Sequence, residues 1–118
     1  MAKAPADQFY WGDWLRDPAL QAASASSRGI WMNLLAHMAF GDPRGQVKGT
    51  PDQLCRLGNC TESEIELFFD EIKHLKFGEQ ITRNGIVTIW CRRMTNQEAA
   101  RQANNKKMRD WRVTKKLL

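Results

Sequence analysis

Two helix-start signals follow one another closely in the middle of the chain, and they constrain the fold more than any other feature. Thr50 is a capping residue followed by Pro51, which favours the first position of a helix. Thr61 and Glu64 form the Thr-x-x-Glu pattern of a second capped start. Only a Gly-Asn pair at positions 58–59 breaks the chain before this second start. The spacing therefore predicts two helices joined by a tight turn, the helix-turn-helix arrangement.

The segment after the second start signal predicts an amphipathic helix and then two strands. The apolar residues that recur at helical spacing are Ile65, Phe68, Phe69, Ile72 and Leu75. Residues 80–83 and 86–90 are predicted to be strands, because the Asn-Gly pair between them is the dipeptide most favoured in a type I′ hairpin turn. We therefore expect a β-hairpin directly after the second helix.

A further helix is predicted upstream of this pair. It begins at Ser26 or Ser27, either of which can act as the N-cap, and it ends at Gly41. Its apolar positions are Ile30, Trp31, Leu34, Leu35 and Met38. Residues 46–48 follow as a short extended segment. The order helix, strand, helix, turn, helix, hairpin predicts a winged helix-turn-helix domain, mainly α with a small β-hairpin.

The chain divides into three predicted parts: an aromatic arm at 1–25, the winged-helix domain at 26–91 and a basic C-terminal helix at 92–118. The arm carries Phe9, Tyr10, Trp11 and Trp14, whose rings we expect to pack over the core because exposing them is costly. Residues 95–118 contain neither Gly nor Pro, which predicts a helix. Their apolar side chains are too sparse for a continuous buried face, so this helix is expected to project from the body.

Charge is distributed unevenly along the 118 residues. Residues 1–91 carry 9 Lys and Arg against 11 Asp and Glu, a formal charge of −2. Residues 92–118 carry 9 against 2, a formal charge of +7. A basic terminal segment of this kind attracts polyanions, of which nucleic acid is the commonest in a cytoplasm. The alternative interpretation is a solvated helix face that only keeps the protein in solution.

Composition excludes several classes of protein. With 42% hydrophobic and 26% charged residues, the chain has the usage of one ordinary globular domain. Neither a signal peptide nor a membrane span is predicted, because no long apolar run follows the N-terminus. The three cysteines, Cys55, Cys60 and Cys91, are an odd number at spacings unlike a disulfide framework. We therefore expect a cytoplasmic protein with reduced thiols.

No enzyme is predicted either, because the chain lacks a Walker loop, a Gly-x-Ser-x-Gly motif and a His-Glu-x-x-His motif. Asp13 and Asp17 in the arm suit local capping better than acid-base chemistry, since no nucleophile accompanies them. A zinc site would use Cys55, Cys60, Cys91 and His74, but their spacing does not match paired zinc ligands. We expect no cofactor, no metal and no small-molecule substrate.

Three stretches resemble a known group of sequences. They are residues 9–17 (Phe-Tyr-Trp-Gly-Asp-Trp-Leu-Arg-Asp), the Ser-x-Arg-Gly-x-Trp start at 26–31, and Arg-Arg-Met at 92–94. Together they make the chain similar to a bacterial family of uncharacterised phage or prophage replication-protein-like domains. More distantly, the chain resembles the N-terminal winged helices of replication initiators and primosome adaptors. The resemblance implies contact with origin DNA or with the replisome, and it supplies no catalytic residue.

The second helix of the predicted pair is poorly suited to DNA, because Glu62, Glu64, Glu66, Asp70 and Glu71 oppose phosphates. We therefore expect contacts, mainly to phosphates, through the hairpin and the basic tail. The candidate DNA-binding residues are Arg83, Asn84, Arg92, Arg93, Arg101, Lys106, Lys107, Arg109, Arg112, Lys115, Lys116, Lys48, Lys73 and Lys76.

Two alternatives accompany this prediction. The acidic face of the second helix could instead dock a basic protein partner or the tail of another copy, which would make the protein an interaction or oligomerisation module. Trp111 stands among tail cations and could stack on a base, although a helix tryptophan more often packs on its own domain or on a partner.

Overall fold

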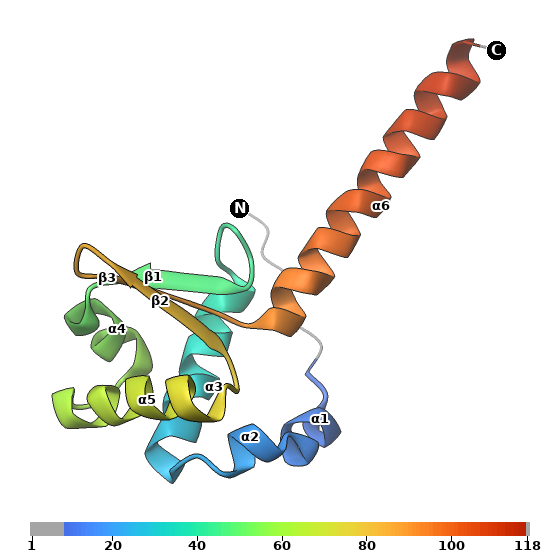
Figure 1. Ribbon diagram of the computed structural model, residues 1–118. Helices are drawn as coiled ribbons and strands as arrows, with labels where there is room; N and C mark the ends of the chain where they lie inside the picture. Colours follow the sequence, from blue (N-terminus) through green and yellow to red (C-terminus); the bar gives the residue numbers. More distant parts are fainter. Residues whose placement is uncertain (1–8, 118) are drawn as a thin grey trace.

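The computed structural model describes residues 9–117, and it has the winged-helix layout followed by a long basic helix (Figure 1). The helices are α1 (Trp11–Arg16), α2 (Pro18–Gln21), α3 (Ala25–Ala39), α4 (Pro51–Gly58), α5 (Glu62–Leu75) and α6 (Arg92–Leu117). The strands are β1 (Gln46–Gly49), β2 (Glu79–Arg83) and β3 (Ile86–Trp90). Residues 1–8 of the predicted arm and residue 118 lie outside the described residues.

The helix-turn-helix pair forms as its capping signals predict. The Thr50 side chain accepts a hydrogen bond from the Gln53 N–H, and the Thr50 N–H donates one to the side-chain oxygen of Gln53. Thr61 and Glu64 make the same reciprocal pair at the start of α5. Between the helices, Asn59 closes α4 in the left-handed conformation, with φ 53°. The turn and both helix starts are therefore confirmed.

The three strands make one antiparallel sheet in the order β1-β3-β2. Asn84 and Gly85 both have positive φ, 52° and 76°, as a type I′ turn requires. Val87 and Ile89 of β3 face the helices and are buried. Because side chains alternate along a strand, Lys48 of β1 and Arg83 of β2 lie on the opposite, outer face with Thr88. The hairpin is the wing of the fold.

The core lies where α3, α4 and α5 meet the inner face of the sheet. Its most deeply buried side chains include Leu34, Leu54, Phe68 and Ile89, each with no exposed surface. Trp31 connects the layers, since its ring stacks 6.4 Å from Phe68 and meets the Phe77 ring edge-on at 5.3 Å. This packing fixes the wing against the helices and so sets the direction in which the chain leaves β3.

The arm differs from its prediction in two ways. It contains the short helices α1 and α2, the second capped by Asp17, whose carboxylate accepts from the N–H groups of Ala19 and Leu20. Its rings do not all pack over the core: Phe9 and Trp14 do, but Trp11 is 66% exposed. Tyr10 and Leu15 are also exposed. The expectation failed because these short helices bury only one side.

The start of one helix also differs from the prediction. Helix α3 begins earlier, because Ser24 rather than Ser26 or Ser27 is the N-cap and accepts from the Ser27 N–H. Helix α6 begins at Arg92, where the predicted basic C-terminal helix starts, and Met94 is buried against the body.

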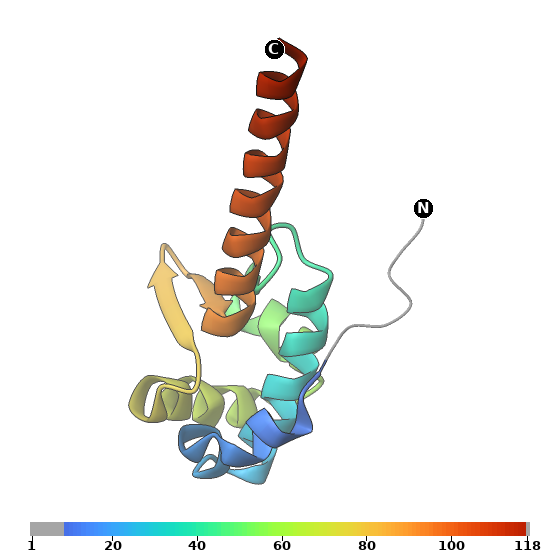
Figure 2. The same cartoon turned by 90° about the vertical axis from the view of Figure 1, so that its right-hand side faces the viewer.

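Beyond its first two turns, α6 projects from the body, as Figures 1 and 2 show from two directions. Every described side chain from Ala99 to Lys116 is exposed. The radius of gyration is 17.2 Å, against about 13.5 Å for a compact chain of this length. The predicted projection is confirmed. Among the described helices, none combines the length and the apolarity that crossing a membrane requires.

Candidate nucleic-acid interface

The projecting part of α6 presents its cations freely to solvent. Lys106, Arg109, Arg112 and Lys116 follow one another at intervals of three or four residues, so they lie along one side of the helix. In the described part of the chain, no carboxylate forms an ion pair with any of these four. We call them the basic stripe. Unpaired cations on a free helix are available to phosphates.

The other side of the projecting helix carries its aromatic group. Trp111 is 56% exposed, and Nζ of Lys115 lies 4.9 Å from the centre of its ring. This is a cation–π contact within the helix. Trp111 therefore does not pack on the described part of its own domain, although a tryptophan in a helix usually packs on its domain or on a partner. Lys107 lies one turn before Trp111 on the same side.

Three predicted phosphate ligands already have carboxylate partners. Arg93 pairs with Asp13 at 2.9 Å, and Arg101 pairs with Glu98 at 2.7 Å. Arg92 pairs with Glu79 and donates a second hydrogen bond to the Lys76 carbonyl. These pairs are exposed enough for phosphates to compete with them. The Arg93 and Arg92 pairs tie the foot of α6 to the arm and the wing, whereas the Arg101 pair lies within α6. Arg92 and Arg93 are therefore positioning residues in the first place.

The Glu98–Arg101 pair acts on the ionisation of both groups. Hydrogen bonds from Arg101 lower the pKa of the Glu98 carboxyl, and the same bonds raise the pKa of Arg101. Both groups are therefore charged at neutral pH. The net charge of this turn of α6 is close to zero, so the cationic part of the helix begins beyond Arg101.

The wing contributes a smaller basic group. Arg83 and Asn84 are exposed at the hairpin, and Lys48 is exposed on the outer face of β1. Lys73 and Lys76 are also exposed, at the end of α5 and directly after it. The predicted residues thus fall into two sets, one on the wing and the end of α5 and a larger one on α6.

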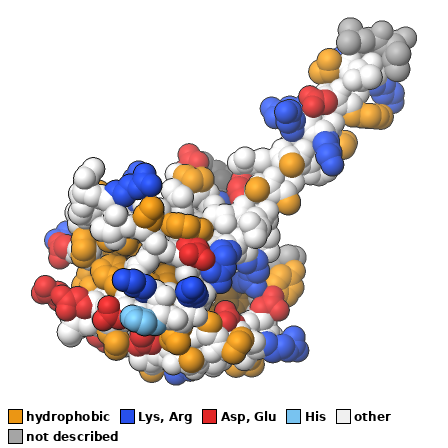
Figure 3. Space-filling model, viewed as in Figure 1, with side chains coloured by type: hydrophobic (Ala, Val, Ile, Leu, Met, Phe, Trp, Pro, Cys, Tyr) orange, Lys and Arg blue, Asp and Glu red, His pale blue; other side chains and the backbone are white. Residues whose placement is uncertain are grey.

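The first half of α5 is acidic, and Figure 3 shows red side chains gathered over this end of the molecule. Glu62, Glu66 and Asp70 are exposed. Glu71 accepts a 2.6 Å hydrogen bond from the Ser24 N–H, so it holds the start of α3. Exposed carboxylates repel phosphates, which disfavours insertion of α5 into a DNA groove.

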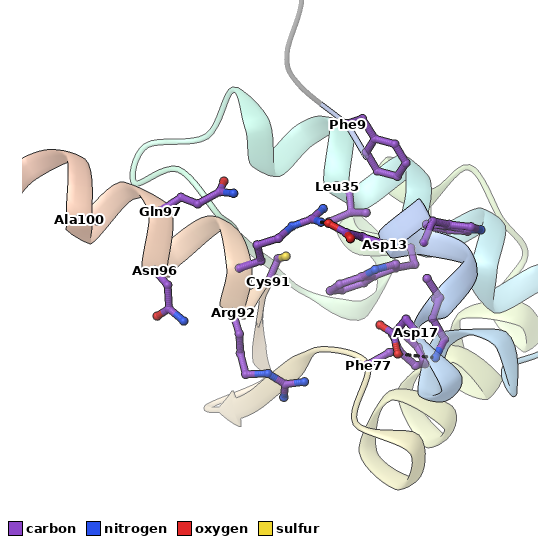
Figure 4. A pocket seen from close by; sticks show the side chains of 14 residues that line it. Phe9, Asp13, Asp17, Leu35, Phe77, Cys91, Arg92, Asn96, Gln97 and Ala100 are labelled. Atoms are coloured by element: carbon purple, nitrogen blue, oxygen red, sulfur yellow. Dashed lines mark hydrogen bonds and ion pairs between the residues drawn. The ribbon is translucent and has the colours of Figure 1, made fainter. Parts of the chain in front are cut away.

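A cleft that no sequence pattern predicts lies between the arm and the foot of α6. Figure 4 shows it: Phe9 and Asp13 lie on the arm side, and Gln97 and Ala100 lie on the α6 side. Its volume is about 710 Å³, within the range of small-ligand sites. Four separate parts of the chain build this cleft, namely the arm, α3, the segment after α5 and the start of α6, so no local motif marks it.

The thiols do not form a metal site in the described part of the chain. No group of three or more His, Cys, Asp and Glu there is arranged to hold a metal ion. Cys55 and Cys60 instead contact each other across the helix-turn-helix turn, with sulfurs 3.8 Å apart. Burial, together with the hydrogen bond to Cys55, raises the pKa of the Cys60 thiol to about 12. His74 is exposed and bonds to the Asp70 carbonyl.

No protein-family model, curated protein or solved structure compared with the chain gives a match. Function is therefore inferred from the fold and from the geometry of these surfaces.

Proposed function

We propose that the protein is a DNA-binding winged-helix module that contacts mainly phosphates through the wing and α6. The observation that carries this proposal is the basic stripe, whose four cations are exposed and have no ion-pair partner among residues 9–117, on a helix that leaves the body. A free helix of this composition gains little from packing, so a polyanion is its natural partner. We further propose that the module belongs to a phage or prophage replication or regulatory protein, a role that the resemblance of residues 9–17, 26–31 and 92–94 supports.

Phosphate contacts carry no sequence information by themselves, so binding is expected to be weakly sequence-specific and strongly dependent on salt. The acidic start of α5 also disfavours sequence-specific binding, because the recognition helix of a conventional helix-turn-helix would place these carboxylates against the DNA backbone.

The test compares two variants of the full chain in fluorescence-anisotropy titrations with duplex DNA. The stripe variant carries Lys106→Gln, Arg109→Gln and Arg112→Gln. The body variant also removes three cations, with Arg16→Gln, Arg28→Gln and Arg56→Gln, and therefore has the same net charge. The stripe variant is expected to bind at least tenfold more weakly than the body variant. Equal affinities, or no binding by the unaltered chain at low salt, would overturn the proposal.

A second candidate is a protein-interaction module on the acidic face of α5. It is favoured by Leu67, which is 43% exposed between Glu66 and Asp70, so an apolar contact is surrounded by carboxylates. A basic partner or the α6 of another copy would complement this surface. Sedimentation of the unaltered chain and of a Glu66→Lys variant separates the two ideas, because only self-association through this face responds to the substitution.

A further inference from the structure

The cleft between the arm and the foot of α6 has an aromatic wall and an apolar floor. Phe9 lies 4.8 Å from Trp11 edge-on and 6.1 Å from Trp14, measured between ring centres, and Phe9 and Trp14 are only partly buried. Trp31 and Phe77, almost fully buried, contribute to the lining from the core. Flat rings at the edge of a cleft offer stacking surface to a planar ligand.

The opposite wall belongs to α6 and is polar. Asn96 and Gln97 line it with amide groups, which can both donate and accept hydrogen bonds, and both side chains are exposed. In Figure 4, Gln97 is directed from α6 toward the arm. A planar group stacked on the arm would present its edge to this wall.

The charges that line the cleft cancel. Its lining contains two positive side chains, Arg92 and Arg93, and two negative ones, Asp13 and Asp17. Asp13 forms an ion pair with Arg93, and Asp17 caps α2. A phosphate gains little in a formally neutral cleft whose cations are already paired. An uncharged, planar group with hydrogen-bonding edges fits it better.

The cleft lies at the N-terminal end of α6, and the exposed cations of this helix follow toward its C-terminal end. Its lining residues Gln97 and Ala100 lie on the same side of α6 as Lys115 and Trp111, because Lys115 follows Gln97 by 18 residues and Trp111 follows Ala100 by 11, both close to a whole number of helical turns. A polyanion that follows Lys107 and Lys115 along this side of α6 toward the body therefore arrives at the cleft, whereas the basic stripe lies on the other side of the helix.

From these features we infer that the cleft receives one unpaired base of single-stranded DNA, while the neighbouring phosphates contact Lys107 and Lys115 on the same side of α6. This inference rests on the proposed DNA binding and adds a preference for single strands. Bases in a duplex are stacked on their neighbours and are not free to enter such a cleft, whereas an unpaired base can leave the stack at little cost.

The test measures affinities of the full chain for an oligo(dT) strand and for a duplex of equal length at the same salt concentration. The variants are Phe9→Ala, on the arm wall, and Gln97→Ala, on the α6 wall. Gln102→Ala is the matched control, because it removes the same amide from the same helix outside this cleft. Gln97 is exposed, so its variant keeps the test valid if Phe9→Ala disturbs the arm.

Single-strand binding is expected to weaken about tenfold in Phe9→Ala and measurably in Gln97→Ala, with duplex binding and the Gln102→Ala variant unchanged. If both cleft variants bind oligo(dT) as the unaltered chain does, the inference fails while the proposed function stands. Such a result would leave the cleft to a protein partner. If the unaltered chain binds neither form of DNA, the proposed function fails, and the inference fails with it.

Discussion

Gly78 lies where the chain passes from α5 into the wing, directly against the ring of Trp31. A Cβ placed on this residue would stand 2.4 Å from Cη2 of Trp31 and 2.8 Å from Cζ3. Real side-chain contacts between carbons begin near 3.4 Å, so Gly78→Ala forces the indole or the wing to move by about 1 Å. Trp31 has little room to move, since it is 4% exposed and packs on Phe68 and Phe77.

Overpacking of this kind costs about 1–3 kcal/mol, and the fixed ring favours the upper half of that range. A loss of about 2 kcal/mol lowers the urea midpoint by roughly 1 M for a chain with an ordinary dependence of stability on denaturant. Equilibrium unfolding in urea, followed by circular dichroism at 222 nm, measures the change.

Gly29→Ala provides the matched control, because the same substitution is made where the structure predicts the opposite sign. Gly29 is exposed in the interior of α3, and its added Cβ would meet nothing within 4 Å. Alanine should therefore stabilise the helix by about 0.5–1 kcal/mol. A Gly78→Ala variant as stable as the unaltered chain would refute the packing of the wing on Trp31 described above.

Three further predictions follow from the core, the thiols and the arm. Ser27 is fully buried, and its hydroxyl has no hydrogen-bond partner among the described residues. Ser27→Ala should therefore leave the free energy of unfolding unchanged or raise it by up to about 1 kcal/mol, which thermal unfolding would show as an unchanged or higher midpoint. The raised pKa of Cys60 keeps its thiol protonated in the folded chain while the unfolded thiol ionises near its ordinary 9.0. The free energy of unfolding should therefore be unaffected by this group below about pH 9 and decline between pH 9 and 12, and a Cys60→Ala variant should lose that part of the decline. The exposed pair between Arg93 and Asp13 should contribute less than about 1 kcal/mol, so Asp13→Asn should barely change global unfolding but should increase proteolysis of the arm; a large loss of global stability would contradict this description.

Local chemistry explains which parts of the fold could be predicted from the sequence. The caps at Thr50 and Thr61 and the turn at Asn84 and Gly85 depend on residues within a few positions of one another. Their patterns therefore specify the same structure in any context that does not oppose them. The order of elements followed from these signals, and with it the winged-helix layout.

The parts that could not be predicted depend on contacts between distant residues. Asp13 and Arg93 are 80 positions apart, and no local pattern announces their ion pair. The cleft beside them arises only when the arm, α3, the segment after α5 and α6 are already in place. For the same reason the sequence could not show that Arg92 and Arg93 serve first to hold α6, or that Trp11 remains exposed.

The most direct test of the account measures how DNA affinity depends on salt. Each phosphate neutralised on duplex DNA contributes about 0.9 to the slope of log binding constant against log salt concentration. The variant that removes Lys106, Arg109 and Arg112 should therefore lose about 2.7 from the slope of the unaltered chain. When the salt concentration rises from 50 to 200 mM, the affinity of the unaltered chain should therefore fall by roughly 40-fold more than the affinity of the stripe variant. The account predicts this loss for the stripe variant and an unchanged slope for the body variant; equal slopes for all three proteins would contradict it.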